Sequence, residues 1–183
     1  MFEELISRIA SALKSRQIPY MIIGGQAVLL YGEPRFTRDI DITLGVNIDS
    51  LDEVLSIAEE LSIKPIPQDI MTFVSQTMVL PALDKVSGMR VDFIFSFTPY
   101  ESEAIERAKR VLLMGEEVCF ASPEDLIIHK IFAGRPRDME DARTILLKNP
   151  DIDLGYIRKW LKQFDASVDG MNFLNTFEGI LNS

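Results

Sequence analysis

The alternation of apolar and polar positions predicts mixed helices and strands in the first part of the chain. Apolar residues at helical spacing predict a helix over Phe2–Ser15. The apolar run Tyr20–Ile23 predicts a short buried strand, and Gln26–Tyr31 predicts a second helix. Asp39–Leu44 alternates acidic and apolar residues, which predicts a strand with one polar face. Ser50–Leu61 has the pattern of an amphipathic helix.

Two β-rich runs follow, and helical patterns dominate the rest. Met71–Leu80 and Met89–Phe95 predict a hairpin with a long loop over Pro81–Gly88. Tyr100–Arg110 predicts a helix, and Val111–Phe120 a pair of short strands. Further helices are predicted over Leu126–Phe132, Met139–Leu147, Ile152–Phe164 and Met171–Leu181. We therefore expect an α/β core over residues 1–120 and a helical C-terminal region over 121–183, packed on that core.

Two glycines and three aspartates carry the candidate chemistry. Gly24-Gly25 ends the first predicted strand, where glycine permits a ligand to approach the backbone closely. The amides at the start of the next helix would face an anion above the glycines. Asp39 and Asp41 lie two residues apart on a predicted strand, so their side chains share one face. Asp92, inside an apolar run, could come from a neighbouring strand.

The three carboxylates together predict a divalent metal site. Clustered carboxylates repel one another unless a cation neutralises them, and hard oxygen ligands suit Mg²⁺. Two-metal nucleotidyl transfer requires such a cluster. Each motif alone has a plainer interpretation, as a turn for Gly24-Gly25 and as the solvent face of an edge strand for Asp39 and Asp41. Asp84 is a competing acid, but it falls in the predicted loop.

Composition and charge narrow the class of protein. The chain has 183 residues, 47% of them hydrophobic and 26% charged, which is typical of one globular core. Its formal net charge of −9 argues against a broad basic surface for nucleic acid. We expect a cytoplasmic protein without a membrane partner, because the apolar runs are short, no leader pattern is seen and the single Cys119 cannot form an internal disulfide.

The remaining reactive side chains have less specific patterns. His129 is the only histidine, and we expect it to make a structural hydrogen bond. Cys119 is expected to be buried and inert. Lys130 could bind a phosphate or face the core boundary. The pattern leaves a catalytic role or an inter-helix ion-pair set open for Arg135, Arg137, Asp138 and Asp141, with an ion pair favoured for Asp141. No serine-hydrolase or P-loop motif is present.

Four sequence blocks resemble the nucleotidyltransferase superfamily, whose fold is that of DNA polymerase β and of minimal bacterial nucleotidyltransferases. The blocks resemble in particular the nucleotidyltransferase toxins of type IV toxin–antitoxin and abortive-infection systems. They are Gly24–Ala27, Arg35–Asp41, Ser122–Lys130 and Arg135–Asp141. The resemblance extends from about Tyr20 to Leu147 and implies an α+β fold, with a mixed sheet flanked by helices and a C-terminal helical extension.

The resemblance also implies roles for individual residues. Asp39 and Asp41 would ligate Mg²⁺ or Mn²⁺, and Asp92 would complete a second metal site and help to activate the acceptor hydroxyl. Lys130 would meet phosphate.

Further residues would bind the nucleotide. Gly24 and Gly25 would hold the triphosphate of an NTP such as ATP, with Gln26 at the helix start. Arg35 and Thr37 would lie at the mouth of the site.

The expected function is Mg²⁺-dependent transfer of an NMP from an NTP to an acceptor hydroxyl. The acceptor could be a tRNA 3′ end, a partner protein as in toxin–antitoxin systems, or a small molecule such as an antibiotic, and the net charge of −9 disfavours RNA. The alternative is a catalytically silent nucleotide- or partner-binding module on the same fold. Equal NTP binding in EDTA and in Mg²⁺ would favour that alternative. Neither the preferred base nor the oligomeric state follows from the sequence.

Overall fold

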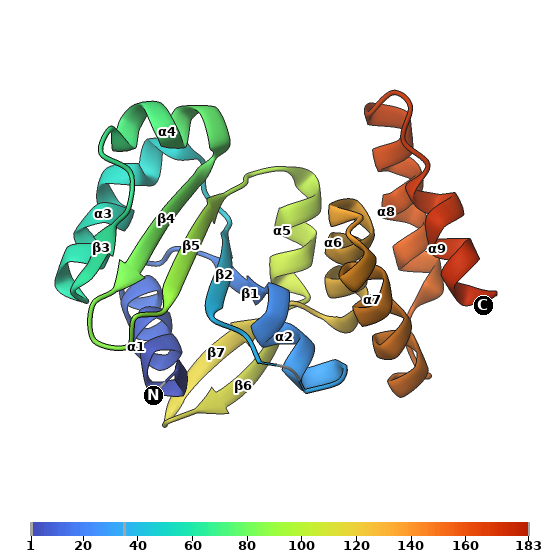
Figure 1. Cartoon of the computed structure of the whole chain (residues 1–183), viewed down its shortest axis with the longest axis horizontal. Coiled ribbons are helices and arrows are strands. Elements are labelled where there is room, and N and C mark those ends of the chain that lie inside the picture. Colours follow the sequence, from blue (N-terminus) through green and yellow to red (C-terminus); the bar gives the residue numbers. More distant parts are fainter. Residues whose placement is uncertain (1, 35, 183) are drawn as a thin grey trace.

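A computed structural model describes residues 2–34 and 36–182, and within them the chain forms a seven-stranded mixed sheet flanked by helices (Figure 1). The strand order is β3-β4-β5-β2-β1-β7-β6. The α+β class predicted from the sequence is therefore confirmed. The strands are β1 (Tyr20–Ile23), β2 (Asp39–Leu44), β3 (Ile63–Pro65), β4 (Val79–Asp84), β5 (Arg90–Phe95), β6 (Lys109–Leu113) and β7 (Glu116–Phe120).

Helices cover the sheet and extend the molecule at its C-terminal end. Figure 1 shows α6 to α9 gathered at one end and α3, α4 and β3 at the other. The helices are α1 (Phe2–Ser15), α2 (Gly24–Tyr31), α3 (Leu51–Glu60, preceded by the 3₁₀ turn Ile48–Ser50), α4 (Ile70–Thr77), α5 (Pro99–Glu106), α6 (Pro123–Ala133), α7 (Pro136–Lys148), α8 (Leu154–Ser167) and α9 (Phe173–Leu181). Every helix within the described residues is too short or too polar to span a lipid bilayer.

The register around β2 fixes the arrangement of the predicted acids. β2 runs antiparallel to β1 and parallel to β5. Asp41 therefore lies opposite Ile23 on one side and opposite Asp92 on the other. The alternate residues Ile40 and Ile42 are fully buried and hold the strand in the core. Because Gly24 follows Ile23 directly, the glycine pair and Asp92 flank Asp41 from the two neighbouring strands.

The prediction of a strand over Met71–Leu80 is wrong for most of its length. The chain forms α4 there, with Asp69 as its N-cap, and the Asp69 side chain accepts a hydrogen bond from the Thr72 amide at 3.1 Å. Val74 is the buried residue of this helix, and its other apolar side chains are partly or fully exposed. Ile70, Phe73 and Val74 do have helical spacing, but the β-branched and aromatic residues of Met71–Leu80 outweighed it in the prediction.

The predicted loop Pro81–Gly88 is also wrong in its first half. β4 continues to Asp84, and the Pro81 carbonyl accepts a hydrogen bond from the Ile66 amide at 2.9 Å. Proline lacks a donor but keeps its acceptor, which allows this position in the sheet. The edge strand β3 was not predicted, because three residues are too short a pattern.

The helix predicted over Tyr100–Arg110 ends at Glu106. Lys109 and Arg110 instead begin β6, where they pair with Phe120 and Cys119. The prediction extended the helix too far because the apolar alternation of β6 begins only after its two basic residues.

Candidate active site

A pocket of about 240 Å³ lies where β1 ends and β2 begins. The structure brings five of the sequence-predicted site residues together around it, from β2, α2 and α6. The lining residues are Gly24, Gly25, Asp39, Asp41, Lys130, Arg135, Arg137 and Asp138. Residues separated by more than 90 positions in the sequence therefore share one cavity.

Gly24, the first residue of α2, lies directly against the Asp41 carboxylate. Its φ angle is +65°, a conformation that L-residues rarely adopt. A Cβ atom at this position would lie 2.0 Å from Asp41 Oδ2. Glycine is thus required twice here, for its backbone angle and for the space that the carboxylate occupies.

The start of α2 beside this carboxylate has no side-chain cap. Ile23 occupies the N-cap position and makes no capping hydrogen bond through its side chain. Amides in the first turn of a helix lack intrahelical partners and carry partial positive charge. The backbone at Gly24 and Gly25 can therefore offer donors to an anion in the pocket.

Asp41 is held in an environment that disfavours its charge. Burial is the main cause, the nearby charges of Asp39 and Asp92 add to it, and together they raise the pKa of Asp41 to about 6. The positive charges of Lys130 and Arg135 oppose this shift only in part. A cation beside the three aspartates would relieve the repulsion, which is the property expected of a metal ligand.

Asp92 lies beside Asp41 in the sheet, but its carboxylate is hydrogen-bonded to Arg90. Arg90 Nε donates a hydrogen bond to Asp92 Oδ1 at 2.8 Å, and Arg90 is two residues away on the same strand. Accordingly, no group of three or more His, Cys, Asp or Glu side chains in residues 2–34 and 36–182 is arranged to hold a metal ion. Oxygen donors of the type that Mg²⁺ prefers are present on adjacent strands, and Arg90 bonds one of the two carboxylate oxygens of Asp92.

Gln26 and Thr37 belong to the support of the acidic strand. Gln26 is buried, and its Nε2 donates to Thr37 Oγ1 at 2.7 Å and to the Asp39 carbonyl at 3.2 Å. These bonds tie the segment before β2 to α2, which fixes the approach to Asp39. Arg35, also predicted for the mouth of the site, lies outside the described residues.

Lys130 is buried between two carboxylates of α7. Its Nζ lies 2.8 Å from Asp138 Oδ1 and 2.8 Å from Asp141 Oδ2. The ion pair expected for Asp141 is therefore present. Burial opposes the ionisation of Asp138, but hydrogen bonds from Arg135 and Lys130 outweigh it and lower the pKa of Asp138.

Arg135, Arg137 and Asp138 line the pocket, although the sequence favoured no catalytic role for them. Arg135 occupies the N-cap of α7, and its Nε contacts Asp138 Oδ2 at 2.6 Å. A signal was present in the sequence: two arginines flank Pro136 at the start of a helix, where the helix dipole disfavours cations. Their placement there suggests an anionic partner.

His129 does not make the predicted hydrogen bond through Nε2. That atom is buried and has no partner among the described residues. Burial lowers the pKa of His129 to about 4, so the imidazole is neutral. The ring lies against Tyr100, with 5.8 Å between ring centroids.

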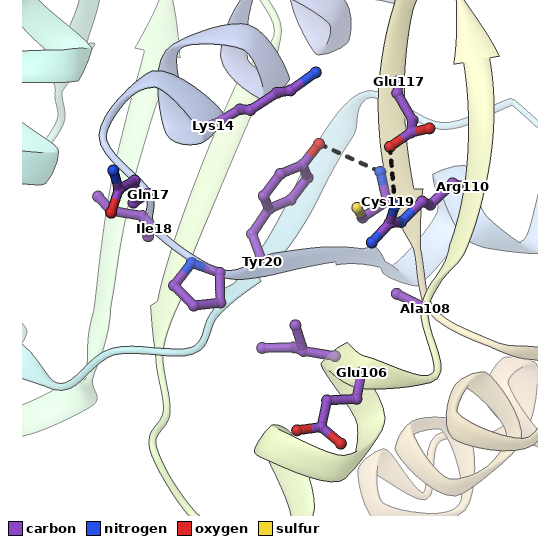
Figure 2. A pocket seen from close by; sticks show the side chains of 11 residues that line it. Lys14, Gln17, Ile18, Tyr20, Glu106, Ala108, Arg110, Glu117 and Cys119 are labelled. Carbon is purple, nitrogen blue, oxygen red and sulfur yellow. Dashed lines mark hydrogen bonds and ion pairs between the residues drawn. The ribbon is translucent and has the colours of Figure 1, made fainter.

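A larger pocket of about 470 Å³ lies at the opposite end of β1, around Tyr20 (Figure 2). Cys119 lines it and is half-buried rather than buried as predicted, with its backbone amide donating to the Tyr20 hydroxyl at 3.3 Å. Burial raises the pKa of the Cys119 thiol, which suppresses its reactivity. Arg110 in this pocket is paired with Glu117. The pocket lacks the glycine and aspartate constellation, so we place the candidate active site at Asp41.

Asp84, the competing acid, is accounted for by the hairpin. It ends β4 instead of lying in a loop, and its Oδ2 accepts a hydrogen bond from the Ser87 amide at 2.7 Å. The carboxylate therefore closes the turn between β4 and β5.

The fold is shared with solved nucleotidyltransferase structures. ANT(2")-Ia in complex with adenylyl-2"-tobramycin gives a TM-score of 0.59 at 19% identity, over 90% of this chain and 97% of that chain. An antigenic nucleotidyltransferase-like protein from Paracoccidioides brasiliensis gives 0.54 at 18% identity, over 95% and 92%. The lincomycin-bound lincosamide antibiotic adenylyltransferase LnuA gives 0.50 at 14% identity, over 73% and 89%. At these identities the likeness establishes the fold.

The family of the chain follows from its sequence. No curated protein matches it. Residues 1–178 match the family described as "Nucleotidyltransferase of unknown function (DUF6036)". Because this match covers nearly the whole sequence, the chain belongs to that family and is a nucleotidyltransferase.

Proposed function

We propose that the enzyme transfers an NMP from an NTP to an acceptor hydroxyl, with divalent cations bound by Asp39, Asp41 and Asp92. The observation that carries the proposal is the contact between the start of α2 and β2, where a Cβ on Gly24 would lie 2.0 Å from Asp41 Oδ2. The carboxylate thus stands directly beside the backbone that would hold the phosphates. Metal-dependent phosphoryl transfer needs a metal-binding carboxylate next to the site that holds the phosphates.

Each residue of the pocket has a task in this proposal. The amides at Gly24 and Gly25 bind the triphosphate, and Asp39 and Asp41 would hold the divalent cations. Bound divalent cations would neutralise the triphosphate and lower the pKa of the attacking hydroxyl. Asp92 would complete the second metal site and help to activate the acceptor hydroxyl, with Arg90 bonded to its Oδ1. Gln26 holds the segment before Asp39 and contacts no substrate.

The net charge of the chain narrows the choice of acceptor class. The net charge of −9 disfavours tRNA, whose phosphates would be repelled by most of the surface. Two proteins of the same fold are described with antibiotics bound, lincomycin and adenylyl-2"-tobramycin. We therefore place a small molecule or a partner protein before tRNA as acceptor. A place in a toxin–antitoxin system stays a prediction of the sequence resemblance.

Transfer can be tested with each α-³²P-labelled NTP in Mg²⁺ or Mn²⁺, with total tRNA, cell lysate or hydroxylated antibiotics as acceptors. We expect labelled product and released pyrophosphate in the wild type and a loss of at least about a thousandfold in Asp41→Asn. EDTA should abolish the reaction. Full activity of Asp41→Asn, or of the wild type in EDTA, would contradict the proposed mechanism.

A further inference from the structure

The positively charged side chains around the pocket differ in whether they are already paired with carboxylates. Lys130 is 4% exposed and lies 2.8 Å from carboxylate oxygens of both Asp138 and Asp141. Arg135 Nε lies 2.6 Å from Asp138. Two positive and two negative charges therefore offset each other within this cluster. Lys130 and Arg135 are therefore both engaged by carboxylates, although the Arg135 side chain is 75% exposed.

Arg137 is the exception among the described residues that line the pocket. Its side chain is exposed and makes no hydrogen bond or ion pair with another described residue. It occupies the first turn of α7, immediately after Pro136, where the helix dipole gives a cation no support. Neither a salt bridge nor helix capping accounts for an arginine here, whereas an anion in the pocket would.

The two sides of the pocket carry opposite charges, which suits a triphosphate with bound cations. β2 contributes Asp39 and Asp41, which attract cations, and α7 contributes Arg137 with its charge uncompensated. A guanidinium binds two phosphate oxygens at once and always remains charged. We propose that Arg137 binds the β- and γ-phosphates of the NTP, and therefore the pyrophosphate that leaves. This inference rests on the proposed nucleotidyl transfer and assigns its phosphate-tail subsite to α7 rather than to Lys130.

The assignment gives Arg137 a defined part in the reaction. The acceptor oxygen forms a bond to the α-phosphorus, and the bond from that phosphorus to the α,β-bridging oxygen breaks. The electron pair leaves with pyrophosphate, and the acceptor proton passes to a carboxylate or to solvent. Negative charge grows on the leaving group during this step. Arg137 stabilises that charge and holds the leaving group in line with the acceptor.

The test compares ligands that share or lack the phosphate tail. Binding of inorganic pyrophosphate, of an α,β-methylene NTP and of the corresponding NMP is measured by calorimetry in Mg²⁺. In Arg137→Gln we expect pyrophosphate and the NTP analogue to bind about ten- to hundredfold more weakly, since charge-assisted hydrogen bonds are lost. The affinity for the NMP should stay within about twofold.

Arg110→Gln is the matched control. It removes the same charge from an exposed arginine on β6 that lines the other pocket. Its affinities for all three ligands should equal those of the wild type, and the melting temperatures of both variants should stay close to that of the wild type. Unchanged pyrophosphate binding in Arg137→Gln would overturn the assignment, and so would an equal loss for the NMP. Arg137-dependent pyrophosphate binding in a protein that fails to transfer any NMP would refute only the proposed transfer.

Discussion

Gly24 gives the sharpest prediction at the scale of single residues. Alanine at this position would combine a left-handed backbone with a Cβ 2.0 Å from Asp41 Oδ2. The carboxylate must move, and a displacement of about 1 Å in a catalytic site costs about a hundredfold in rate. We expect Gly24→Ala to lose NMP transfer by at least that factor.

Gly88→Ala is a control that adds the same backbone strain as Gly24→Ala without the steric clash. Gly88 has φ +71°, close to the +65° of Gly24, but no atom lies within 4 Å of an added Cβ. This control should lose about 1–2 kcal/mol of stability and keep full transfer activity. If both variants retain activity, the contact between Gly24 and Asp41 has no functional role.

Asp41→Asn should stabilise the metal-free enzyme at neutral pH. The pKa of Asp41 in the folded state, about 6, exceeds the ordinary aspartate value of 3.8, so the ionised carboxylate destabilises the folded state. Stability from this group is fully present below the unfolded pKa and is lost as the pH rises through about 6. We expect Asp41→Asn to gain about 1–3 kcal/mol at pH 7.5 in EDTA, and the gain to shrink towards pH 4.

Urea unfolding of both proteins at the two pH values measures that gain. Mg²⁺ should stabilise the wild type more than the variant, because it relieves the same repulsion. A variant that is less stable than the wild type at pH 7.5 in EDTA would show that Asp41 is not under electrostatic strain.

Sequence spacing predicted which acids lie near one another, but it did not predict the hydrogen-bond partner of each acid. The i, i+2 rule placed Asp39 and Asp41 on one face, and an apolar context marked Asp92 as a neighbour. The Arg90 hydrogen bond to Asp92 depends on side-chain rotamers, which spacing does not encode. The unpaired state of Arg137 follows only once Lys130 and Arg135 are seen to occupy the nearby carboxylates.

At the scale of elements, the buried charges between α6 and α7 predict a large stability effect. Lys130→Met would leave Asp138 and Asp141 without their ammonium partner, and side chains of these acids are only 3% and 10% exposed. Breaking such a pair typically costs about 3–5 kcal/mol. We expect that loss in chemical unfolding, together with reduced transfer.

Two further variants show whether the loss comes from removing the ammonium group beside these acids. Lys130→Met combined with Asp138→Asn should recover part of the stability, because one buried charge is removed. Lys148→Met at the other end of α7 breaks an exposed pair with Glu33 and a hydrogen bond to the Gly32 carbonyl, and should cost about 1 kcal/mol. A cost of Lys130→Met as small as that of Lys148→Met would argue against a structural role for the buried cluster.

The elements that were predicted correctly are those whose periodicity is supported by burial. α1 buries one apolar face, and its observed bounds Phe2–Ser15 equal the predicted ones. The prediction failed for α4 because the helix buries Val74 alone, and the β-branched and aromatic residues of the run outweighed the helical spacing of Ile70, Phe73 and Val74. β3 failed because a three-residue edge strand is recognised by its partner β4 rather than by its own sequence.

At the scale of the whole molecule, side chains from both halves of the sequence share one set of buried contacts. Tyr100 of α5 packs edge-on against Trp160 and Phe164 of α8, with 5.1 Å between centroids in both cases. The Tyr156 hydroxyl donates to Asp125 Oδ1 at 2.8 Å, which links α8 to α6. Removing the C-terminal helices would expose these aromatic rings and strip a buried carboxylate of a donor.

We therefore propose that residues 121–183 pack on the core and unfold together with it. Trp160 is the only tryptophan, and its fluorescence reports on α8 and on its contact with Tyr100 of α5, whereas far-UV circular dichroism reports on all helices and strands. Cooperative unfolding requires both signals to have the same midpoint and slope in urea. An earlier fluorescence transition would mean that the C-terminal helices form a separate unit, and the shared contacts of Tyr100 would then be too weak to couple them to the sheet.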